Sequence, residues 1–292
     1  MTAGGVLGAT MTRDELRTVT VRGVTLTVRR RGSGPDVLFI GGLGNDLTLW
    51  DPLIAETDDI TAVTVDAPGI GSSSLPPRPL FMYELAAMYR ELIEVLGLES
   101  ATVIGYSFGG AVAQQLAIQS PEAVSRLVLC ATGPGVGGFP GDPVALLEVS
   151  TPLRYYNIER LRRVTPILYG GMRAQGNGRF RAEQIARTTS PPSVLAYAYQ
   201  VFALMGWSAL PWLNRVRART LIIAGDDDPI FPLGNAHLMA SCIPDSTLSV
   251  RPGAGHLLVI DEAPEVGPLV SRFVHGIDPL TIQETDPEGT RR

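Results

Sequence analysis

The residues of this chain that could do chemistry begin with one serine. Ser107 lies in the pattern Gly-Tyr-Ser-Phe-Gly-Gly, directly after the apolar residues 101–104. This order predicts a strand, a sharp turn that carries the hydroxyl at its apex, and a helix over residues 109–119. The strand and the helix would approach each other closely at this turn, so Gly105 and Gly109, which have no side chain, fit there. The positive N-terminal end of the helix would face the turn, where negative charge would develop during a reaction. The pattern therefore predicts a nucleophilic serine.

A serine hydroxyl is a poor nucleophile at neutral pH and needs a general base beside it. The chain has three histidines. His256 follows a Gly-Ala-Gly loop after the strand-like residues 247–250, so its imidazole could reach back to Ser107. His237 and His275 fall on predicted helices, where an ordinary surface histidine is the simpler interpretation. We therefore predict that His256 is the base.

An imidazole base is oriented by an acid that holds its second ring nitrogen. The sequence Gly-Asp-Asp-Asp-Pro follows the predicted strand 220–224. We predict that Asp228 is this acid, because Pro229 fixes the chain just beyond it. Asp226 and Asp227 are predicted to accept hydrogen bonds from backbone amides of the turn.

Acyl transfer also requires donors for a developing oxyanion. One predicted donor is the backbone N–H of Phe108, and the other is that of Leu43 in the run Gly-Gly-Leu-Gly-Asn. Gly42 and Asn45 of the same run are candidate substrate contacts. Two interpretations of Asn45 stay open, since it could polarise the loop or cap the next helix. The sequence contains no lysine and no phosphate-loop pattern, which argues against nucleotide binding here.

Short apolar runs alternate with helix-like segments along the chain. The predicted strands are a two-stranded hairpin at 18–28 and single strands at 36–40, 61–65, 101–106, 127–130, 220–224 and 247–250. Further helices are predicted at 82–96, 233–241 and 264–274. This alternation predicts an α/β fold, a mostly parallel eight-stranded sheet with helices on both faces. Ser107, Asp228 and His256 all follow strands, at the edge where such sheets carry their sites.

The alternation stops in one aromatic-rich segment, which we interpret as a helical cap inserted after the sixth strand. The predicted units are a flexible flank at 1–15, a core at 16–139 and 214–276, the cap at 140–213, and a flexible tail at 277–292. The cap aromatics suit an apolar acyl chain. Tyr199, Phe202 and Trp207 are candidate substrate contacts, although such residues could equally form the core of the cap.

Composition narrows the class of protein. The net charge of −5 gives no support for nucleic-acid binding. No apolar run reaches the roughly 18 residues of a membrane span, and the first residues do not resemble a secretory signal. Cys130 and Cys242 have neither disulfide-scaffold nor metal-site spacing. We therefore predict a cytoplasmic protein that uses no metal and no cofactor.

Taken together, these residues resemble the α/β-hydrolase superfamily over about residues 18–276, in which the catalytic order is serine, acid, histidine. The loop at 66–73 is similar to the loop after the fourth strand in that family. The cap segments at 152–156, 169–171 and 199–207 are similar to those of intracellular medium-chain-length polyhydroxyalkanoate depolymerases.

This resemblance implies a serine esterase that works through an acyl-enzyme, with aliphatic 3-hydroxyacyl esters, small or polymeric, as substrates. Alternatives are a small-ester or lactone esterase, a thioesterase and a carbon–carbon bond hydrolase, because one triad serves them all. Ser107 disfavours the dehalogenases and epoxide hydrolases of the fold, which carry aspartate there. A ligand receptor is the alternative outside enzymes. Association with a polymer-granule surface would require an exposed apolar patch, and the oligomeric state stays open.

Overall fold

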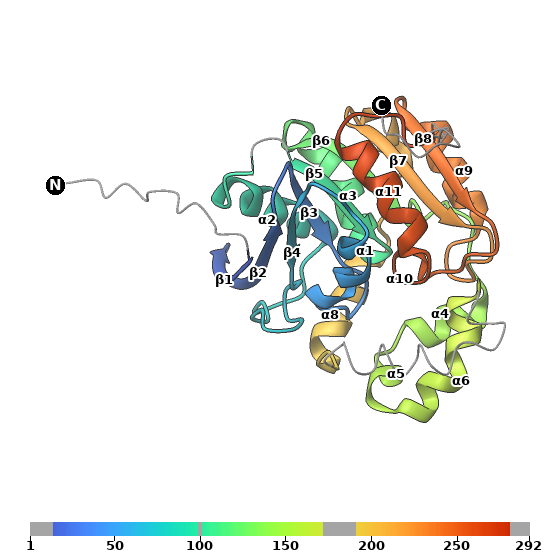
Figure 1. Ribbon diagram of the computed structural model, residues 1–292. Helices are drawn as coiled ribbons and strands as arrows, with labels where there is room; N and C mark the ends of the chain where they lie inside the picture. Colours follow the sequence, from blue (N-terminus) through green and yellow to red (C-terminus); the bar gives the residue numbers. More distant parts are fainter. Residues whose placement is uncertain (1–13, 99–100, 172–190, 281–292) are drawn as a thin grey trace.

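A central eight-stranded sheet organises the molecule (Figure 1), and the computed structural model describes residues 14–98, 101–171 and 191–280. The strand order is β1-β2-β4-β3-β5-β6-β7-β8. The pairs β1–β2 and β2–β4 are antiparallel, and the remaining pairs are parallel. The predicted mostly parallel sheet is therefore confirmed.

From β3 onward, most strands lie within about two residues of the predicted ranges, whereas β1 and β2 extend about four residues beyond the predicted hairpin 18–28 at each end. The strands are β1 (Asp14–Val21), β2 (Val24–Gly32), β3 (Asp36–Ile40), β4 (Thr61–Val65), β5 (Ala101–Tyr106), β6 (Val124–Cys130), β7 (Arg219–Gly225) and β8 (Ser246–Arg251). β6 begins three residues before the predicted 127–130, because Val124 already pairs with Ala101 beside an irregularity in the register. β1 includes the last two residues of the predicted flank 1–15. The rest of that flank, and residues 281–292 of the predicted tail, lie outside the described residues.

Helices cover both faces of the sheet. The α-helices are α1 (Asp51–Ala55), α2 (Met82–Val95), α3 (Phe108–Gln119), α4 (Pro143–Val149), α5 (Leu153–Tyr156), α6 (Ile158–Tyr169), α8 (Val194–Leu204), α9 (Leu233–Cys242), α10 (Leu258–Asp261) and α11 (Ala263–Val274). The 3-10 helices are η1 (Leu47–Trp50), η2 (Pro121–Ala123) and η4 (Leu210–Arg215). The short η1, α1 and α10 have no counterpart among the predicted ranges.

Successive side chains of a strand point to opposite faces of the sheet, so the buried strands contribute residues to two separate hydrophobic clusters. Leu38 of β3 packs in the cluster that contains Leu116 of α3, whereas its neighbour Phe39 packs in the cluster that contains Phe273 of α11. Strands covered on both faces are buried at every position, as in β4 and β5, whose residues are mostly apolar or β-branched and include the buried threonines Thr61, Thr64 and Thr102.

Four described α-helices, α4, α5, α6 and α8, and the 3-10 helix η4 lie between β6 and β7, where the cap is predicted. Figure 1 shows α4, α5 and α6 together, to one side of the sheet. Residues 172–190 of the predicted cap lie outside the described residues. In the described ranges, no helix has the length and apolar character needed to cross a membrane.

Candidate active site

Ser107 occupies the turn between β5 and α3 in a conformation that few residues adopt. Its φ of 53° and ψ of −116° place it at positive φ, which costs a non-glycine residue about 1–3 kcal/mol. Hydrogen bonds from the core hold this turn. The Ser107 N–H donates to the Cys130 carbonyl at 3.0 Å, and the Thr132 hydroxyl donates to the Ser107 carbonyl at 2.8 Å. The side chain therefore lies at the carboxyl end of the sheet, as the sequence pattern predicts.

The two predicted glycines lie where the backbones touch. A Cβ on Gly105 would lie 2.5 Å from the Gly109 carbonyl oxygen, and a Cβ on Gly109 would lie 2.0 Å from the Ile40 carbonyl oxygen. Their missing side chains allow α3 to begin directly against the ends of β5 and β3. The start of α3 and the loop after β3 are thereby brought together.

We expect Gly109→Ala to lower the free energy of unfolding by about 2–3 kcal/mol or more, because the new methyl group meets rigid backbone rather than a movable side chain. Gly41→Ala is the matched control, since its Cβ would meet nothing closer than 3.6 Å. Urea denaturation of both variants measures the difference. Equal stability of the two would show that the close approach at Gly109 is relaxed in solution.

Three of the predicted residues form one hydrogen-bonded chain. His256 Nε2 lies 3.1 Å from Ser107 Oγ, and His256 Nδ1 lies 2.8 Å from Asp228 Oδ2. The second oxygen of Asp228 accepts the N–H groups of Ile230 and Phe231, at 2.8 and 3.0 Å. The carboxylate is thereby fixed by its own turn. This chain can move a proton from the serine hydroxyl to the imidazole.

The other two aspartates bind amides of two different segments, the loop that carries His256 and the chain just after α6 in the cap segment. Asp226 Oδ1 accepts the N–H of Gly253, and Asp227 Oδ2 accepts the N–H of Gly171, both at 2.6 Å. The prediction that these carboxylates bind amides of their own turn is therefore wrong in its partners, because Asp228 binds the amides of that turn. Asp226 and Asp227 instead join neighbouring loops to the end of β7.

The imidazole of His256 is enclosed by aromatic rings and is only 3% exposed. The ring centroids of Tyr106, Phe231 and Tyr169 lie 5.2, 5.7 and 6.4 Å from its own. Its backbone N–H donates to the Tyr169 carbonyl at 2.7 Å. Shielding from water strengthens the electrostatic interactions within the chain of three residues. The other two histidines are exposed on or beside α9 and α11, as the sequence suggests.

The two predicted oxyanion donors lie on the segments joined at Gly109. The Phe108 N–H is the first of α3, where helical amides have no intrahelical acceptor. Leu43 lies in the turn after β3, in which the Asn45 N–H donates to the Gly42 carbonyl at 3.2 Å. The cap of the following helix η1 is Asp46, whose side chain accepts the Thr48 N–H. The helix-cap interpretation of Asn45 is therefore wrong.

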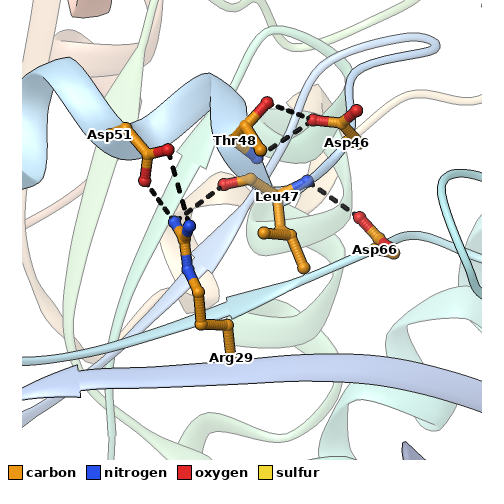
Figure 2. Close-up of polar contacts among 6 residues, drawn as sticks. All are labelled: Arg29, Asp46, Leu47, Thr48, Asp51 and Asp66. Carbon is orange, nitrogen blue, oxygen red and sulfur yellow. Dashed lines mark hydrogen bonds and ion pairs between the residues drawn. The ribbon is translucent and has the colours of Figure 1, made fainter. Parts of the chain in front are cut away.

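Core residues anchor the segment that follows this turn (Figure 2). The Leu47 N–H donates to Asp66 Oδ1 at 2.8 Å, and the Leu47 carbonyl accepts from Arg29 at 3.4 Å. Arg29 also forms an ion pair with Asp51 at the start of α1. Burial raises the pKa of the Asp66 carboxyl, while the amides of Ser72 and Leu47 act in the opposite direction. These contacts hold the segment after the turn against residues of β2 and of the loop that follows β4.

The candidate substrate contacts of the cap occupy different places. Tyr199 lines an apolar cavity together with Phe108. Phe202 packs against Phe81 at a centroid distance of 5.1 Å, and the Trp207 indole donates to Gln115 at 2.9 Å. Tyr199 is therefore the one of the three that the structure places beside a predicted oxyanion donor.

Sequence reasoning missed several polar residues around the loop. Tyr155 donates to the Leu43 carbonyl at 2.9 Å, and Gln200 accepts the Gly44 N–H at 2.8 Å. Arg154 is 3% exposed and donates to the Tyr155 hydroxyl at 3.2 Å. No local pattern marks Arg154 or Gln200. Within the described ranges, no group of three or more histidine, cysteine or acidic residues could hold a metal ion.

Comparison with known proteins identifies relatives of this chain by sequence and by fold. The sequence profile of the family described as alpha/beta hydrolase fold matches residues 35–263. A poly(3-hydroxyalkanoate) depolymerase of Ectopseudomonas oleovorans is 36% identical over 82% of this chain and 83% of its own length. A 3-oxoadipate enol-lactonase of Acinetobacter baylyi is 26% identical over 84% of this chain and 91% of its own. A meta-cleavage product hydrolase of Pseudomonas fluorescens superposes with a TM-score of 0.76 at 21% identity, covering 89% of this chain and 97% of that one.

Proposed function

This chain belongs to the α/β-hydrolase fold family and is an ester hydrolase, and on that premise we propose that it works through an acyl-enzyme on Ser107 and acts on aliphatic 3-hydroxyacyl esters. The observation that carries the mechanism is the hydrogen-bonded chain of Asp228, His256 and Ser107, with links of 2.8 and 3.1 Å. These three groups come from the ends of β7, β8 and β5. Because three separate strand ends bring these groups to one edge of the sheet, their arrangement supports a shared role in proton transfer.

In the proposed reaction His256 Nε2 accepts the proton of Ser107 as the serine oxygen attacks the ester carbonyl carbon. Asp228 keeps the proton on Nδ1, so that Nε2 presents its lone pair, and stabilises the imidazolium that forms. The imidazolium then gives its proton to the departing alcohol. Water, deprotonated by the same nitrogen, attacks the acyl-enzyme, and the acid leaves as Ser107 recovers its proton.

The oxyanion of each tetrahedral intermediate would lie against the N–H groups of Leu43 and Phe108. Donors already fixed before the reaction stabilise this charge without reorganising, which is commonly the largest single contribution to such catalysis. Phe108 is held at the start of α3, and Leu43 lies in a turn whose following segment is anchored to the core. The rigidity of both segments supports this assignment.

We propose that the acyl chain lies toward an apolar cavity that Phe108 helps to line. The cavity has a volume of about 20 Å³, room for about one water-sized group, so its lining residues would move apart to admit the chain. It lies between α2, α8 and the loop after β4, and its lining residues are Ala67, Pro68, Pro76, Leu80, Leu85, Tyr89, Phe108, Tyr199 and Gln200. Burial of each methylene contributes about 0.8 kcal/mol, so such a lining favours aliphatic acyl groups. The 36% identity with a poly(3-hydroxyalkanoate) depolymerase supports the 3-hydroxyacyl class.

Rates on para-nitrophenyl esters from acetate to dodecanoate, followed by clearing of a poly(3-hydroxyoctanoate) emulsion, test the proposal. We expect a preference for medium chains and clearing of the polymer. Activity on short esters alone would keep the mechanism and overturn the polymer substrate. Absence of turnover on every ester would overturn the acyl-enzyme mechanism on esters and favour carbon–carbon bond hydrolysis or ligand reception.

Two further proposals concern where the protein acts. We retain the prediction of a cytoplasmic protein and propose contact with the surface of a polymer granule. Exposed apolar side chains of the cap segment support this contact, among them Leu147, Val194 and Met205, which are 69%, 62% and 73% exposed. Fractionation of cells that hold granules, with this protein detected in the granule and soluble fractions, tests both.

A further inference from the structure

The peptide group between Leu43 and Gly44 is held at both of its polar ends by the cap segment. The Tyr155 hydroxyl donates to the Leu43 carbonyl at 2.9 Å, and the Gly44 N–H donates to Gln200 Oε1 at 2.8 Å. Tyr155 belongs to α5 and Gln200 to α8. Two cap helices therefore contact one peptide of the loop that carries a proposed oxyanion donor.

This peptide is the one whose orientation defines the turn. The Asn45 N–H donates to the Gly42 carbonyl, φ is +73° at Gly44, and Leu43 is not among the residues at positive φ. These features define a type II β-turn, which differs from type I by a flip of the central peptide of about 180°. The central peptide here is Leu43–Gly44. The cap contacts therefore stabilise the type II form against the type I form.

Both ends of the turn are fixed without help from the cap. Before it, the carbonyl groups of Ile40 and Gly41 lie directly against Gly109 at the start of α3. After it, Asp66 and Arg29 hold the Leu47 peptide, as Figure 2 shows. The turn thus spans two fixed points. The cap contacts the central peptide of this turn and, through the Tyr155 hydroxyl, the side-chain amide of Asn45, whose Nδ2 donates to that hydroxyl at 3.5 Å.

Arg154 determines the direction in which the Tyr155 hydroxyl donates its proton. Its buried guanidinium donates to that hydroxyl at 3.2 Å and lies 4.4 Å from the centre of the Tyr155 ring. A hydroxyl has one proton, and Tyr155 must accept from the arginine, so the proton is left for the Leu43 carbonyl. Burial raises the pKa of the Tyr155 hydroxyl, which keeps this donor protonated at neutral pH.

We propose that Tyr155 and Gln200 are positioning residues through which the docked cap completes the oxyanion hole, and that Arg154 orients Tyr155 for this task. The inference rests on the proposed function, in which the Leu43 N–H holds the oxyanion. The Leu43 N–H belongs to the preceding Gly42–Leu43 peptide, so the cap acts on it through the position of Leu43 as a whole. With the cap contacts broken, the Leu43 carbonyl loses its tether to α5, and Leu43 can shift and carry its N–H away from the start of α3. Transition-state stabilisation is then lost, while the acyl cavity still binds substrate.

Tyr155→Phe removes the hydroxyl and keeps the ring over Arg154, so it tests the contact with little loss of packing. We expect kcat for a para-nitrophenyl ester to fall about 10- to 100-fold with KM within about twofold, because only the transition state loses an interaction. Tyr156→Phe is the matched control. Its hydroxyl donates to the Pro192 carbonyl and not to the turn, and we expect wild-type kcat.

Inhibitors separate a positioning role from a merely structural one. An alkyl trifluoromethyl ketone adds to Ser107 and forms a tetrahedral oxyanion, whereas the product carboxylic acid mimics the ground state. In Tyr155→Phe, we expect the inhibition constant of the ketone to rise by the same factor as kcat/KM falls. That of the acid should stay within about twofold. Equal weakening of both inhibitors would overturn the proposal.

A second variant guards against a folding defect in the first. Gln200→Met removes the acceptor for the Gly44 N–H and should also lower kcat about 10-fold or more. The double variant should lose less than the product of the two single losses, because both contacts hold one peptide. Wild-type kcat in both single variants would overturn the inference and leave the proposed function intact. Failure of the wild-type protein to hydrolyse any ester would instead overturn the proposed function.

Discussion

Replacement of Ser107 by alanine should lower kcat for ester hydrolysis by about 10⁵- to 10⁶-fold and leave the fold intact. The hydroxyl is the protein group that forms a bond to the acyl carbon in the proposed mechanism, so no acyl-enzyme can form in its absence. Residual turnover would come from water held near the oxyanion donors. Steady-state rates of hydrolysis of a para-nitrophenyl ester of the preferred chain length measure this loss of kcat.

Two controls accompany the Ser107→Ala variant. Ser241→Ala removes an exposed hydroxyl that donates to the Leu238 carbonyl on α9, and it should keep full activity. An alkyl fluorophosphonate should add one label to the wild-type protein and none to Ser107→Ala, as read by intact-protein mass spectrometry. A labelled Ser107→Ala protein, or one that still hydrolyses esters at the wild-type rate, would show that another residue is the nucleophile.

Replacement of Asp228 by asparagine should lower kcat about 10⁴-fold. The amide oxygen can still accept the N–H groups of Ile230 and Phe231, so the turn is preserved. The amide NH₂ then faces His256 Nδ1, which must become an acceptor. The imidazole proton moves to Nε2, the nitrogen that faces Ser107, and the lone pair needed for proton removal is lost.

The matched control for Asp228→Asn is its neighbour. Asp227→Asn changes a carboxylate that accepts the Gly171 N–H and makes no contact with the imidazole, so its kcat should fall less than about tenfold. Steady-state kinetics of both variants at pH 7 and pH 9 measure the contrast. Similar losses in the two variants would mean that total negative charge, rather than the contact to Nδ1, supports the base.

The residues proposed for hydrolysis could be selected from the sequence because each follows a local rule. A serine held at positive φ between a strand and a helix needs small neighbours, and Gly105 and Gly109 supply them where a Cβ would lie 2.5 and 2.0 Å from a backbone oxygen. Apolar runs buried on both faces gave strands whose bounds lie within a few residues of those observed. The carboxyl ends of parallel strands then bring the candidate residues to one edge.

Other assignments depended on contacts that no local rule encodes. The sequence-based prediction of the amides that Asp226 and Asp227 bind was wrong. Three adjacent carboxylates cannot be told apart in the sequence, because their partners depend on how the turn folds. The cap for η1 proved to be Asp46 and not Asn45, a distinction of one residue that backbone geometry decides. Short helices such as α1 and α10 carry too few residues for a periodic pattern.

The sequence by itself determined the α/β fold, the succession of strands along the chain and the residues proposed for bond cleavage, because these follow from periodicity, glycine sterics and strand ends. Only the tertiary structure decided how the cap meets the oxyanion loop. Tyr155 and Gln200 are 112 and 156 residues from the loop residues they contact. Hydrogen bonds over such separations form only when helices dock, since their direction and length depend on packing that no local segment contains.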